Sequence, residues 1–273
     1  MRRIRRLLGI GALFAALTAL TQIGGLAYLF GLTVGCLPGL RGISPVLRRT
    51  TTILAGTLVY VVFTAVVVPP LATSLGRVRL PCHVDGEGPV VAATPLTCVL
   101  NRGYVRPEVR DLLMALGTEA GRRFPGTQLT ALEGNFPFGN GFPLLPHLSH
   151  QDGKRVDVAY FYEDAAGSIG HGSPSPIGYF VYEQPRTGDR LPCSGRWTPL
   201  RWNFAWLQPD PPRWRLDQQR TAWMVEWLKN NPSVSRLFLE PHLADRLGVA
   251  SGKVRFQGCQ AARHDDHIHI DVP

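Results

Sequence analysis

Two long apolar runs occupy the first third of the chain, and neither contains a charged residue in its apolar part. The first runs from Leu7 to Leu40 and loses its apolar character near Gly35, and the second runs from Thr50 to Gly76. About 20 apolar residues in a helix cross the hydrocarbon core of a bilayer. The pattern therefore predicts two transmembrane helices, at about residues 7–35 and 51–71, in a membrane anchor formed by residues 1–79.

From residue 80 onward the pattern changes to short amphipathic segments, which are typical of a folded domain. Apolar residues at a spacing of three to four predict helices at Arg106–Phe124 and Asp217–Asn230. Alternating and β-branched residues predict strands, which are Gln128–Leu132, Val156–Tyr162, Val234–Leu239 and His267–Val272. The stretch Gly167–Pro212 is rich in Gly, Pro and Trp and is expected to be loop. Residues 80–273 are thus predicted to form one α+β domain.

The charge distribution separates the same two parts of the chain. The formal net charge is +9, from 29 Lys and Arg against 20 Asp and Glu, and no acidic residue precedes Asp85. Nine arginines lie before residue 80, so the remaining 29 − 9 = 20 basic residues balance the 20 acidic ones. A neutral domain behind a basic, apolar leader argues against nucleic-acid binding and favours a membrane as the partner.

The orientation in the membrane is ambiguous from the arginines alone. Four arginines precede the first apolar run, and three more (Arg41, Arg48 and Arg49) lie in the connection Cys36–Thr50. The positive-inside rule favours a cytoplasmic N-terminus, and two spans would then return the domain to the cytoplasm. The alternative is a cleaved signal peptide, although the first apolar run is longer than the roughly 7–15 residues usual for one.

Four cysteines of the domain favour an oxidising compartment. Cys82, Cys98, Cys193 and Cys259 lack the close spacing of a zinc knuckle, and an even number suits two disulfides. Three pairings are open, of which Cys82–Cys98 with Cys193–Cys259 is favoured because it closes the shortest loop. Free thiols in a cytoplasmic domain are the alternative.

Histidines cluster at two places in the domain. The first cluster contains His147 and His150 and is followed by Asp157, and the second is His264-Asp265-Asp266-His267-Ile268-His269. Residues two apart on a strand share a face, so His267 and His269 project together. If the strand with Asp157 lies beside them, imidazoles and a carboxylate converge in a set that suits zinc and leaves a fourth position for water. His83, His171 and His242 are expected to be structural.

The pattern His-x2-His-x6-Asp followed by His-x2-His-x-His resembles the penicillin-insensitive murein endopeptidases. They belong to the LAS-type zinc peptidases, a group that includes lysostaphin-type enzymes, D-Ala-D-Ala carboxypeptidases and the hedgehog signalling domain. The resemblance covers residues 105–273 and implies a small antiparallel sheet with flanking helices. It departs from the family pattern in Gly134–Phe142, before His147.

The resemblance also implies a role for each matching residue. It implies that His150, Asp157 and His269 bind Zn2+, and that His267 orients or deprotonates the attacking water. His264 and His147 match positions that stabilise the oxyanion or protonate the leaving amine. Asp265 and Asp266 would orient these imidazoles or lie in solvent. Four tryptophans, Trp197, Trp202, Trp206 and Trp214, would line a substrate wall or be buried.

These observations together predict a membrane-anchored zinc metallopeptidase. Its domain would lie outside the cytoplasmic membrane, in the periplasm or its equivalent, and would cut amide bonds in peptidoglycan stem peptides or cross-links. A D,D-carboxypeptidase is the alternative within the class, and a zinc-stabilised binding module without catalysis is the alternative outside it. The cysteines and the substrate both favour an external domain over the arginine count.

Overall fold

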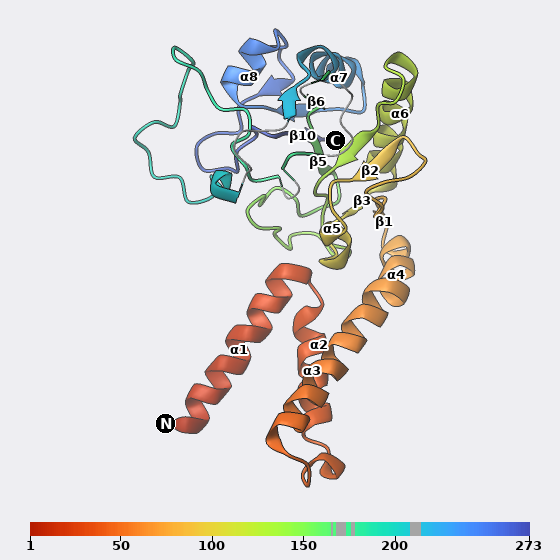
Figure 1. Ribbon diagram of the computed structural model, residues 1–273, viewed down its shortest axis with the longest axis vertical. Coiled ribbons are helices and arrows are strands. Elements are labelled where there is room, and N and C mark those ends of the chain that lie inside the picture. The colour runs from red at the N-terminus through yellow and green to blue at the C-terminus, as the bar shows by residue number, and fades with distance from the viewer. Residues whose placement is uncertain (165, 168–172, 176–177, 208–213) are drawn as a thin grey trace.

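A group of N-terminal helices leads into a mixed α/β domain in the computed structural model (Figure 1), which describes all residues except 165, 168–172, 176–177 and 208–213. The helices form the lower half of the view and the domain the upper half. Short connections at Pro38–Leu40 (η1) and Ala205–Leu207 (η3) are 3-10 helices.

The first apolar run forms two helices, so the prediction of one helix at residues 7–35 is wrong. Helix α1 (Arg2–Thr21) ends at Gln22, whose φ of 67° lies in the left-handed region, and α2 (Gly24–Gly35) then runs back. A non-glycine residue rarely adopts a positive φ, and it ends the helical hydrogen bonding here. Hydropathy alone did not reveal this turn, because Gln22 is uncharged and apolar residues follow it.

The second apolar run is longer as a helix than predicted. Helix α3 (Pro45–Val62) begins at Ser44, whose hydroxyl accepts a hydrogen bond from the Leu47 amide, and continues through a π-helical turn, η2 (Phe63–Val67), into α4 (Val68–Ser74). Two prolines, Pro69 and Pro70, lie in this continuation. Proline lacks the amide that a helix interior needs, and the π-helical turn directly before them changes that bonding pattern.

Small residues let α2 pack closely on α3. A Cβ atom added at Gly31 would lie 2.5 Å from the Thr52 carbonyl oxygen, and one at Gly56 would lie 3.1 Å from the Ala27 carbonyl oxygen. Close backbone approach through small residues is the usual way in which helices associate in lipid. The close contact of α2 and α3 is thus compatible with a membrane location.

Two helical segments, Arg3–Thr21 and Pro45–Ser74, are long and apolar enough to cross a membrane. Leucines and valines on their outer faces are not covered by other residues; Leu54, Leu58 and Val66, for example, are 62–65% exposed. An exposed apolar surface of this extent indicates contact with a membrane or a partner. The N-terminus and the α2–α3 connection both lie at the end of the helices remote from the domain (Figure 1). Both arginine clusters therefore lie at that remote end.

The domain is built on a six-stranded sheet in the order β2-β4-β5-β10-β8-β9. The strands are β2 (Val90–Ala92), β4 (Leu129–Ala131), β5 (Arg155–Ala159), β8 (Arg236–Phe238), β9 (Val254–Arg255) and β10 (His267–Asp271). The four central strands are antiparallel, whereas the edge pairs β2–β4 and β8–β9 are parallel. The sheet is thus mixed, where the resemblance implied a small antiparallel one.

Shorter elements complete the domain. Two small sheets pair β1 (Val78–Arg79) with β3 (Tyr104–Val105) and β6 (Tyr162–Asp164) with β7 (Trp214–Leu216). The helices are α5 (Leu96–Val99), α6 (Pro107–Arg123), α7 (Gln218–Asn230) and α8 (Pro241–Arg246). The two long helices match the predicted ranges because local features fix their ends, which are Pro107 at the start of α6 and the Asp217 cap of α7.

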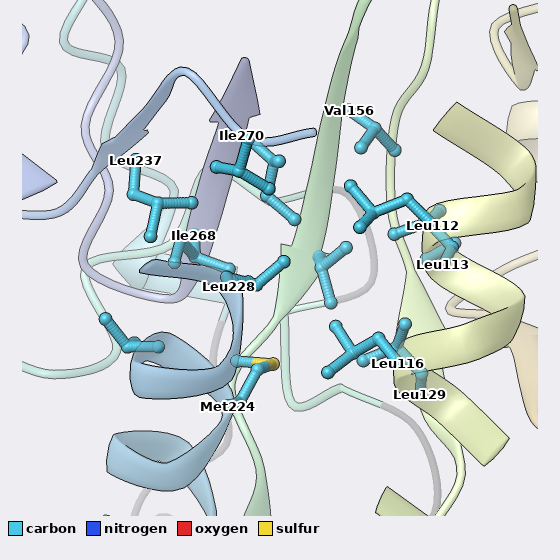
Figure 2. Close-up of a cluster of buried hydrophobic side chains, with 14 of the residues drawn as sticks. Leu112, Leu113, Leu116, Leu129, Val156, Met224, Leu228, Leu237, Ile268 and Ile270 are labelled. Carbon is cyan, nitrogen blue, oxygen red and sulfur yellow. The ribbon is translucent and has the colours of Figure 1, made fainter. Parts of the chain in front are cut away.

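The core lies between the sheet and helices α6 and α7, as Figure 2 shows. Leu112, Leu113 and Leu116 of α6 face Leu129 and Val156 of the sheet, while Met224 and Leu228 of α7 face Ile268 and Ile270 of β10. All of these side chains are at most 5% exposed. The core therefore fixes β5 and β10 as neighbours at the centre of the sheet.

Two disulfides, Cys82–Cys98 and Cys193–Cys259, confirm the favoured pairing. Their Cα–Cα distances of 5.8 Å and 5.5 Å are in the ordinary range. Cys36 is free and exposed. Disulfides are typical of proteins outside the reducing cytoplasm.

The helices are docked directly on the domain. Only residues 75–77 separate α4 from β1. Ile23, Val68, Ala72 and Tyr104 form a small apolar cluster at this junction. Beside it, Asn101 donates from its amide to Thr64 Oγ1 at 3.2 Å, and Tyr60 donates to the Val99 carbonyl oxygen at 2.5 Å.

We expect Leu116→Ala to lower the free energy of unfolding by about 2–5 kcal/mol, because it empties a fully buried site in the core. Val99→Ala is the control, since Val99 is 52% exposed, and it should change stability by less than about 0.5 kcal/mol. Denaturant unfolding of the detergent-solubilised protein measures both. Equal effects would contradict the assignment of the core.

Candidate metal centre

Strand β10 supplies two histidines to one face of the sheet. His267 and His269 project together, and β10 pairs with β5 so that His269 lies directly opposite Asp157. Side chains of directly opposed residues point to the same face. Both strands are anchored by the core residues that alternate with these polar ones, such as Ile268, Ile270 and Val158. The core on one face thus places the imidazoles and the carboxylate on the other.

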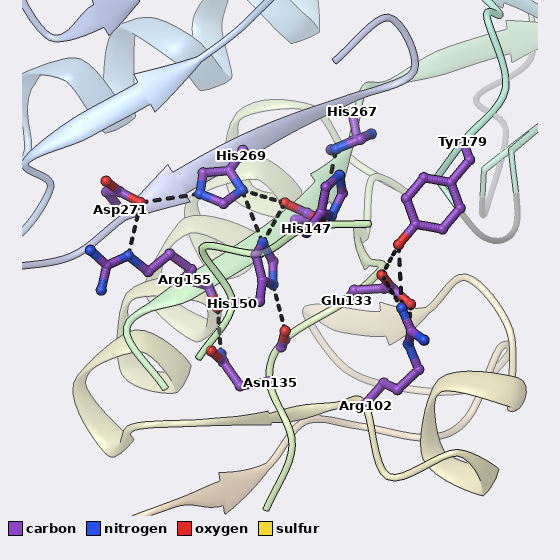
Figure 3. A network of polar contacts seen from close by, with 12 residues as sticks. Arg102, Glu133, Asn135, His147, His150, Arg155, Tyr179, His267, His269 and Asp271 are labelled. Atoms are coloured by element: carbon purple, nitrogen blue, oxygen red, sulfur yellow. Dashed lines mark hydrogen bonds and ion pairs between the residues drawn. The ribbon is translucent and has the colours of Figure 1, made fainter. Parts of the chain in front are cut away.

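The connection between β4 and β5 supplies His147 and His150. The two residues form a tight turn in which the His150 amide donates to the His147 carbonyl oxygen at 2.9 Å. Figure 3 shows both imidazoles pointing toward His269 and His267 of β10. His264, from the segment just before β10, stacks on His147 with ring centroids 5.8 Å apart. The structure therefore brings all six predicted site residues together.

Three donor atoms lie at nearly equal separations. His269 Nδ1 lies 2.9 Å from His150 Nε2 and 2.9 Å from Asp157 Oδ1, and His150 Nε2 lies 3.2 Å from Asp157 Oδ1. All three residues are at most 1% exposed. A buried set of two imidazoles and one carboxylate at such distances could hold a metal ion.

His147 also belongs to the cluster of donors. Its Nδ1 lies 2.5 Å from the second oxygen of Asp157, and one ring nitrogen of each of His147, His264 and His267 lies within 4.8 Å of the others. The Nε2 atoms of His147, His264 and His267 are buried without a hydrogen-bond partner in the described part of the chain. A buried polar atom without a hydrogen-bond partner costs free energy. These three Nε2 atoms are therefore expected to contact a bound ligand or ion.

The outer nitrogens of the donor imidazoles are held by hydrogen bonds. His150 Nδ1 lies 2.5 Å from the Gly134 carbonyl oxygen, and His269 Nε2 lies 3.1 Å from Asp271 Oδ1. Hydrogen bonds of this kind fix the tautomer of a metal-binding histidine and leave the inner nitrogen free. Gly134 and Asp271 were missed by sequence reasoning, although Asp271 continues the alternation of His267 and His269 along β10.

Asp266 orients His267 in the same way. Its Oδ1 lies 2.5 Å from His267 Nδ1, while its Oδ2 accepts from the Phe180 amide at 2.9 Å. Asp265 instead binds Arg263 at 2.6 Å. Of the two alternatives for this acidic pair, orientation of an imidazole therefore applies to Asp266 only, and neither carboxylate lies in solvent.

The electrostatics of the cluster suit a cation. Burial alone would raise the pKa of Asp157, but the imidazoles of His147, His150 and His267 hold that pKa well below its ordinary value. Burial lowers the pKa of His147 to about 4 and, together with the neighbouring imidazoles, lowers the pKa of His264 strongly. Near pH 7, Asp157 is thus ionised, which is the state that a carboxylate ligand needs, and His147 and His264 are neutral.

His267 differs from the other imidazoles. Burial alone would lower its pKa, but the carboxylates of Asp157 and Asp266 raise that pKa to about 9. A dication bound at Asp157 opposes this effect, because its charge repels a proton on the neighbouring ring. The protonation state of His267 therefore depends on whether Asp157 binds a cation.

A second polar group, Arg102, Glu133 and Tyr179, lies beside the histidines (Figure 3). Arg102 Nε lies 2.5 Å from Glu133 Oε1, Tyr179 donates to Glu133 Oε2, and the Tyr179 ring lies 5.2 Å from that of His147. Arg102 also donates to the Leu145 carbonyl oxygen at 2.6 Å, two residues before His147. Sequence reasoning missed this group because its members come from three distant segments.

The tryptophans do not form one wall. Trp197 and Trp206 are 80% and 76% exposed, whereas Trp214 packs against the core. Only Trp202 approaches the cluster, through Tyr179 at a centroid distance of 5.7 Å. The prediction that His242 is structural is confirmed by its buried Nε2, 2.8 Å from the Glu183 carbonyl oxygen. His83 is exposed, and His171 lies outside the described residues.

One surface pocket reaches the cluster at His147. It has a volume of about 310 Å3, and its lining includes His147, Leu148, Leu200, Gln257, Ala261 and Ala262. The rest of the described lining includes a second amide, Gln260, and no other ionisable side chain. The other five histidine and aspartate residues lie behind His147 and are buried.

No protein-family model matches the chain, and no curated protein matches it either.

We expect the chain to bind one divalent metal ion, and Asp157→Ala to weaken that binding at least 100-fold. Asp157 contributes the only carboxylate among the three closest donors, and its loss removes the charge that balances the ion. Competition for Zn2+ against a chromophoric chelator measures the affinity. His242→Ala is the control, because it removes a buried histidine outside the cluster. Unchanged Zn2+ affinity in Asp157→Ala would contradict the assignment.

Proposed function

We propose that this protein is a membrane-anchored zinc metallopeptidase that hydrolyses amide bonds in peptidoglycan stem peptides or cross-links. The observation that carries the proposal is the convergence of three closely spaced donors, His150, Asp157 and His269, with the unpartnered imidazoles of His267 and His264 beside them. A site that only stabilised the fold would need the donors alone.

Zinc is the metal that fits these donors best. With bonds of about 2.0–2.1 Å, tetrahedral geometry places two ligand atoms about 3.3 Å apart, close to the distances of 2.9–3.2 Å among the three donors. Three protein ligands leave a fourth position for water. A zinc ion in this position would lower the pKa of that water to about 7 and polarise a substrate carbonyl.

The remaining imidazoles provide the other parts of amide hydrolysis. His267 has its Nδ1 held by Asp266 and its Nε2 3.8 Å from Asp157 Oδ2, so that Nε2 faces the metal position and can accept a proton there. His264 and His147 carry unpartnered Nε2 atoms on the same side. These two can donate to the developing oxyanion or to the leaving amine.

The substrate class rests on the resemblance to murein endopeptidases and on the pocket beside His147. That pocket is lined by alanines, leucines and amides, which suit a peptide of small side chains such as alanine. A D,D-carboxypeptidase would use the same metal site on a terminal residue. A binding module without catalysis would need neither His267 nor His264 in their present positions.

The alternating directions of the helices support an external domain. Because α1 ascends, α2 returns and α3–α4 ascends again, both arginine clusters lie opposite the domain (Figure 1). With the arginines in the cytoplasm, as the positive-inside rule favours, the domain lies outside. The two disulfides agree with this side.

We expect His267→Ala to retain zinc and to lose about 100-fold to 10,000-fold in the rate of hydrolysis, because general-base catalysis contributes that much. The zinc-loaded full-length protein in detergent is incubated with peptidoglycan fragments, and mass spectrometry follows the conversion of cross-linked dimers to monomers. His83→Ala is the control, since His83 is exposed and is not part of the cluster.

Three results of this digest distinguish the candidates. Release of monomers supports an endopeptidase, whereas shortened pentapeptides with intact dimers identify a carboxypeptidase. Intact dimers and intact pentapeptides with the zinc-loaded wild type would exclude both peptidases. A full rate in His267→Ala would overturn its assignment as the base.

Cys36 provides a test of topology, because it is the free cysteine, is exposed and lies at the arginine end of α2. In intact cells we expect a membrane-permeant maleimide to label Cys36 and an impermeant maleimide not to label it. A cysteine introduced at the exposed Ser194 of the domain should react with both reagents once the outer layers are permeable. Labelling of Cys36 by the impermeant reagent would place the domain in the cytoplasm.

A further inference from the structure

The loop that carries His147 and His150 is held by two residues of the membrane anchor. We propose that Arg77 and Gln22 are positioning residues of the metal centre. The anchor would then help to place the metal ligands in addition to attaching the domain to the membrane. The inference rests on the proposed metal site but not on the reaction that it performs.

Arg77 follows the last membrane helix and inserts into the loop. It is 4% exposed, and its guanidinium donates to the carbonyl oxygens of Phe136 and Gly139, to Asn140 Oδ1 at 3.0 Å and to the Gln151 carbonyl oxygen at 3.3 Å. These acceptors lie on both sides of the segment 147–150. A single planar cation thus joins the beginning of the loop to its end, directly after His150.

Gln22 holds the same loop from a second side. Its Nε2 donates to the Phe138 carbonyl oxygen at 2.7 Å, and its Oε1 accepts from the Phe138 amide at 3.0 Å. Gln22 occupies the turn between α1 and α2 in the left-handed conformation. The turn that sends the chain back through the helices therefore presents an amide that pairs with both backbone groups of one loop residue.

The loop needs this support because it has no regular secondary structure between β4 and β5. Its own contacts with the rest of the domain include Asn135, which donates to the Arg155 carbonyl oxygen at 2.8 Å, and the Arg102 bond to Leu145. His150 Nδ1 is bonded to Gly134 of the same loop. Displacement of the loop therefore moves a predicted metal ligand together with the group that fixes its tautomer.

A purely structural role for these contacts makes a different prediction. If Arg77 and Gln22 only joined two parts of the fold, their loss would lower stability and leave the affinity for metal unchanged. If they position the loop, their loss weakens metal binding even where the protein remains folded. The affinity for Zn2+ and the geometry of the bound ion separate the two roles.

The test uses the full-length protein in detergent, Zn2+ competition against a chelator, and the visible spectrum of the Co2+-loaded protein as a measure of coordination geometry. We expect Arg77→Met to weaken Zn2+ binding about 10-fold to 100-fold, the range for residues that support metal ligands. Arg77→Lys should recover part of this loss, because the charge and some of the bonds remain.

Gln22→Gly tests the second contact without disturbing the turn, because glycine adopts a positive φ readily. We expect it to weaken Zn2+ binding about 3-fold to 10-fold, within the range for effects passed through a chain of contacts. Gln22→Glu keeps the size but cannot donate to Phe138 and should behave similarly.

Matched controls come from the same chain. Gln128 donates to the carbonyl oxygens of Gly86 and Gly88, and the buried Arg220 donates to the Tyr162 carbonyl oxygen, both in regions without site residues. Gln128→Ala and Arg220→Met should change stability and leave Zn2+ affinity and the Co2+ spectrum unchanged.

Wild-type Zn2+ affinity and an unchanged Co2+ spectrum in Gln22→Gly and Arg77→Lys, or in Arg77→Met where it folds, would overturn the positioning role while leaving the proposed function intact. Equal weakening in Arg220→Met would overturn it too, since the effect would then follow stability. A wild-type protein that binds no zinc would overturn the metal site itself and the proposed function with it.

Discussion

The buried carboxylate of Asp157 is the constraint on which the rest of the structure depends. An ion taken out of water costs several kcal/mol unless partners surround it. Here the partners are imidazoles from two segments, the β4–β5 loop and β10, which are far apart in the sequence. The core between α6, α7 and the sheet fixes β5 against β10 and so sets His269 opposite Asp157. The β4–β5 loop must then bring His147 and His150 to the same point. Ordering that loop costs conformational entropy that no β-sheet hydrogen bonds within the loop offset.

The sequence predicted what is local and missed what is long-range. Helices α6 and α7 have proline or aspartate at their starts and regular apolar spacing, so their ends were predictable within a residue or two. The six site residues were predictable because a strand places alternate residues on one face and the histidines occur in two short runs. Gly134, Asp271 and the group formed by Arg102, Glu133 and Tyr179 were not, since each contributes through a contact that depends on the folded chain.

The first membrane segment gives the clearest physical reason for a wrong prediction. Hydropathy averages over a window, and a single uncharged residue with a positive φ, Gln22, does not change the average. Yet that residue reverses the chain, so that the second arginine cluster lies at the same end of the helices as the first. The same residue then pairs with Phe138 of the domain. One backbone angle therefore links the topology of the anchor to the shape of the loop that carries His150.

The short connection between α4 and β1 limits the distance between the helices and the metal centre. Three extended residues span about 10 Å at most, and the junction cluster of Ile23, Val68, Ala72 and Tyr104 holds the domain against the helices. The domain is therefore held close to the ends of the helices. Under the proposed function, the peptidoglycan that it cuts has to lie in the layer next to the membrane. The short connection of residues 75–77, rather than the metal centre itself, therefore limits how far from the helices a substrate can lie.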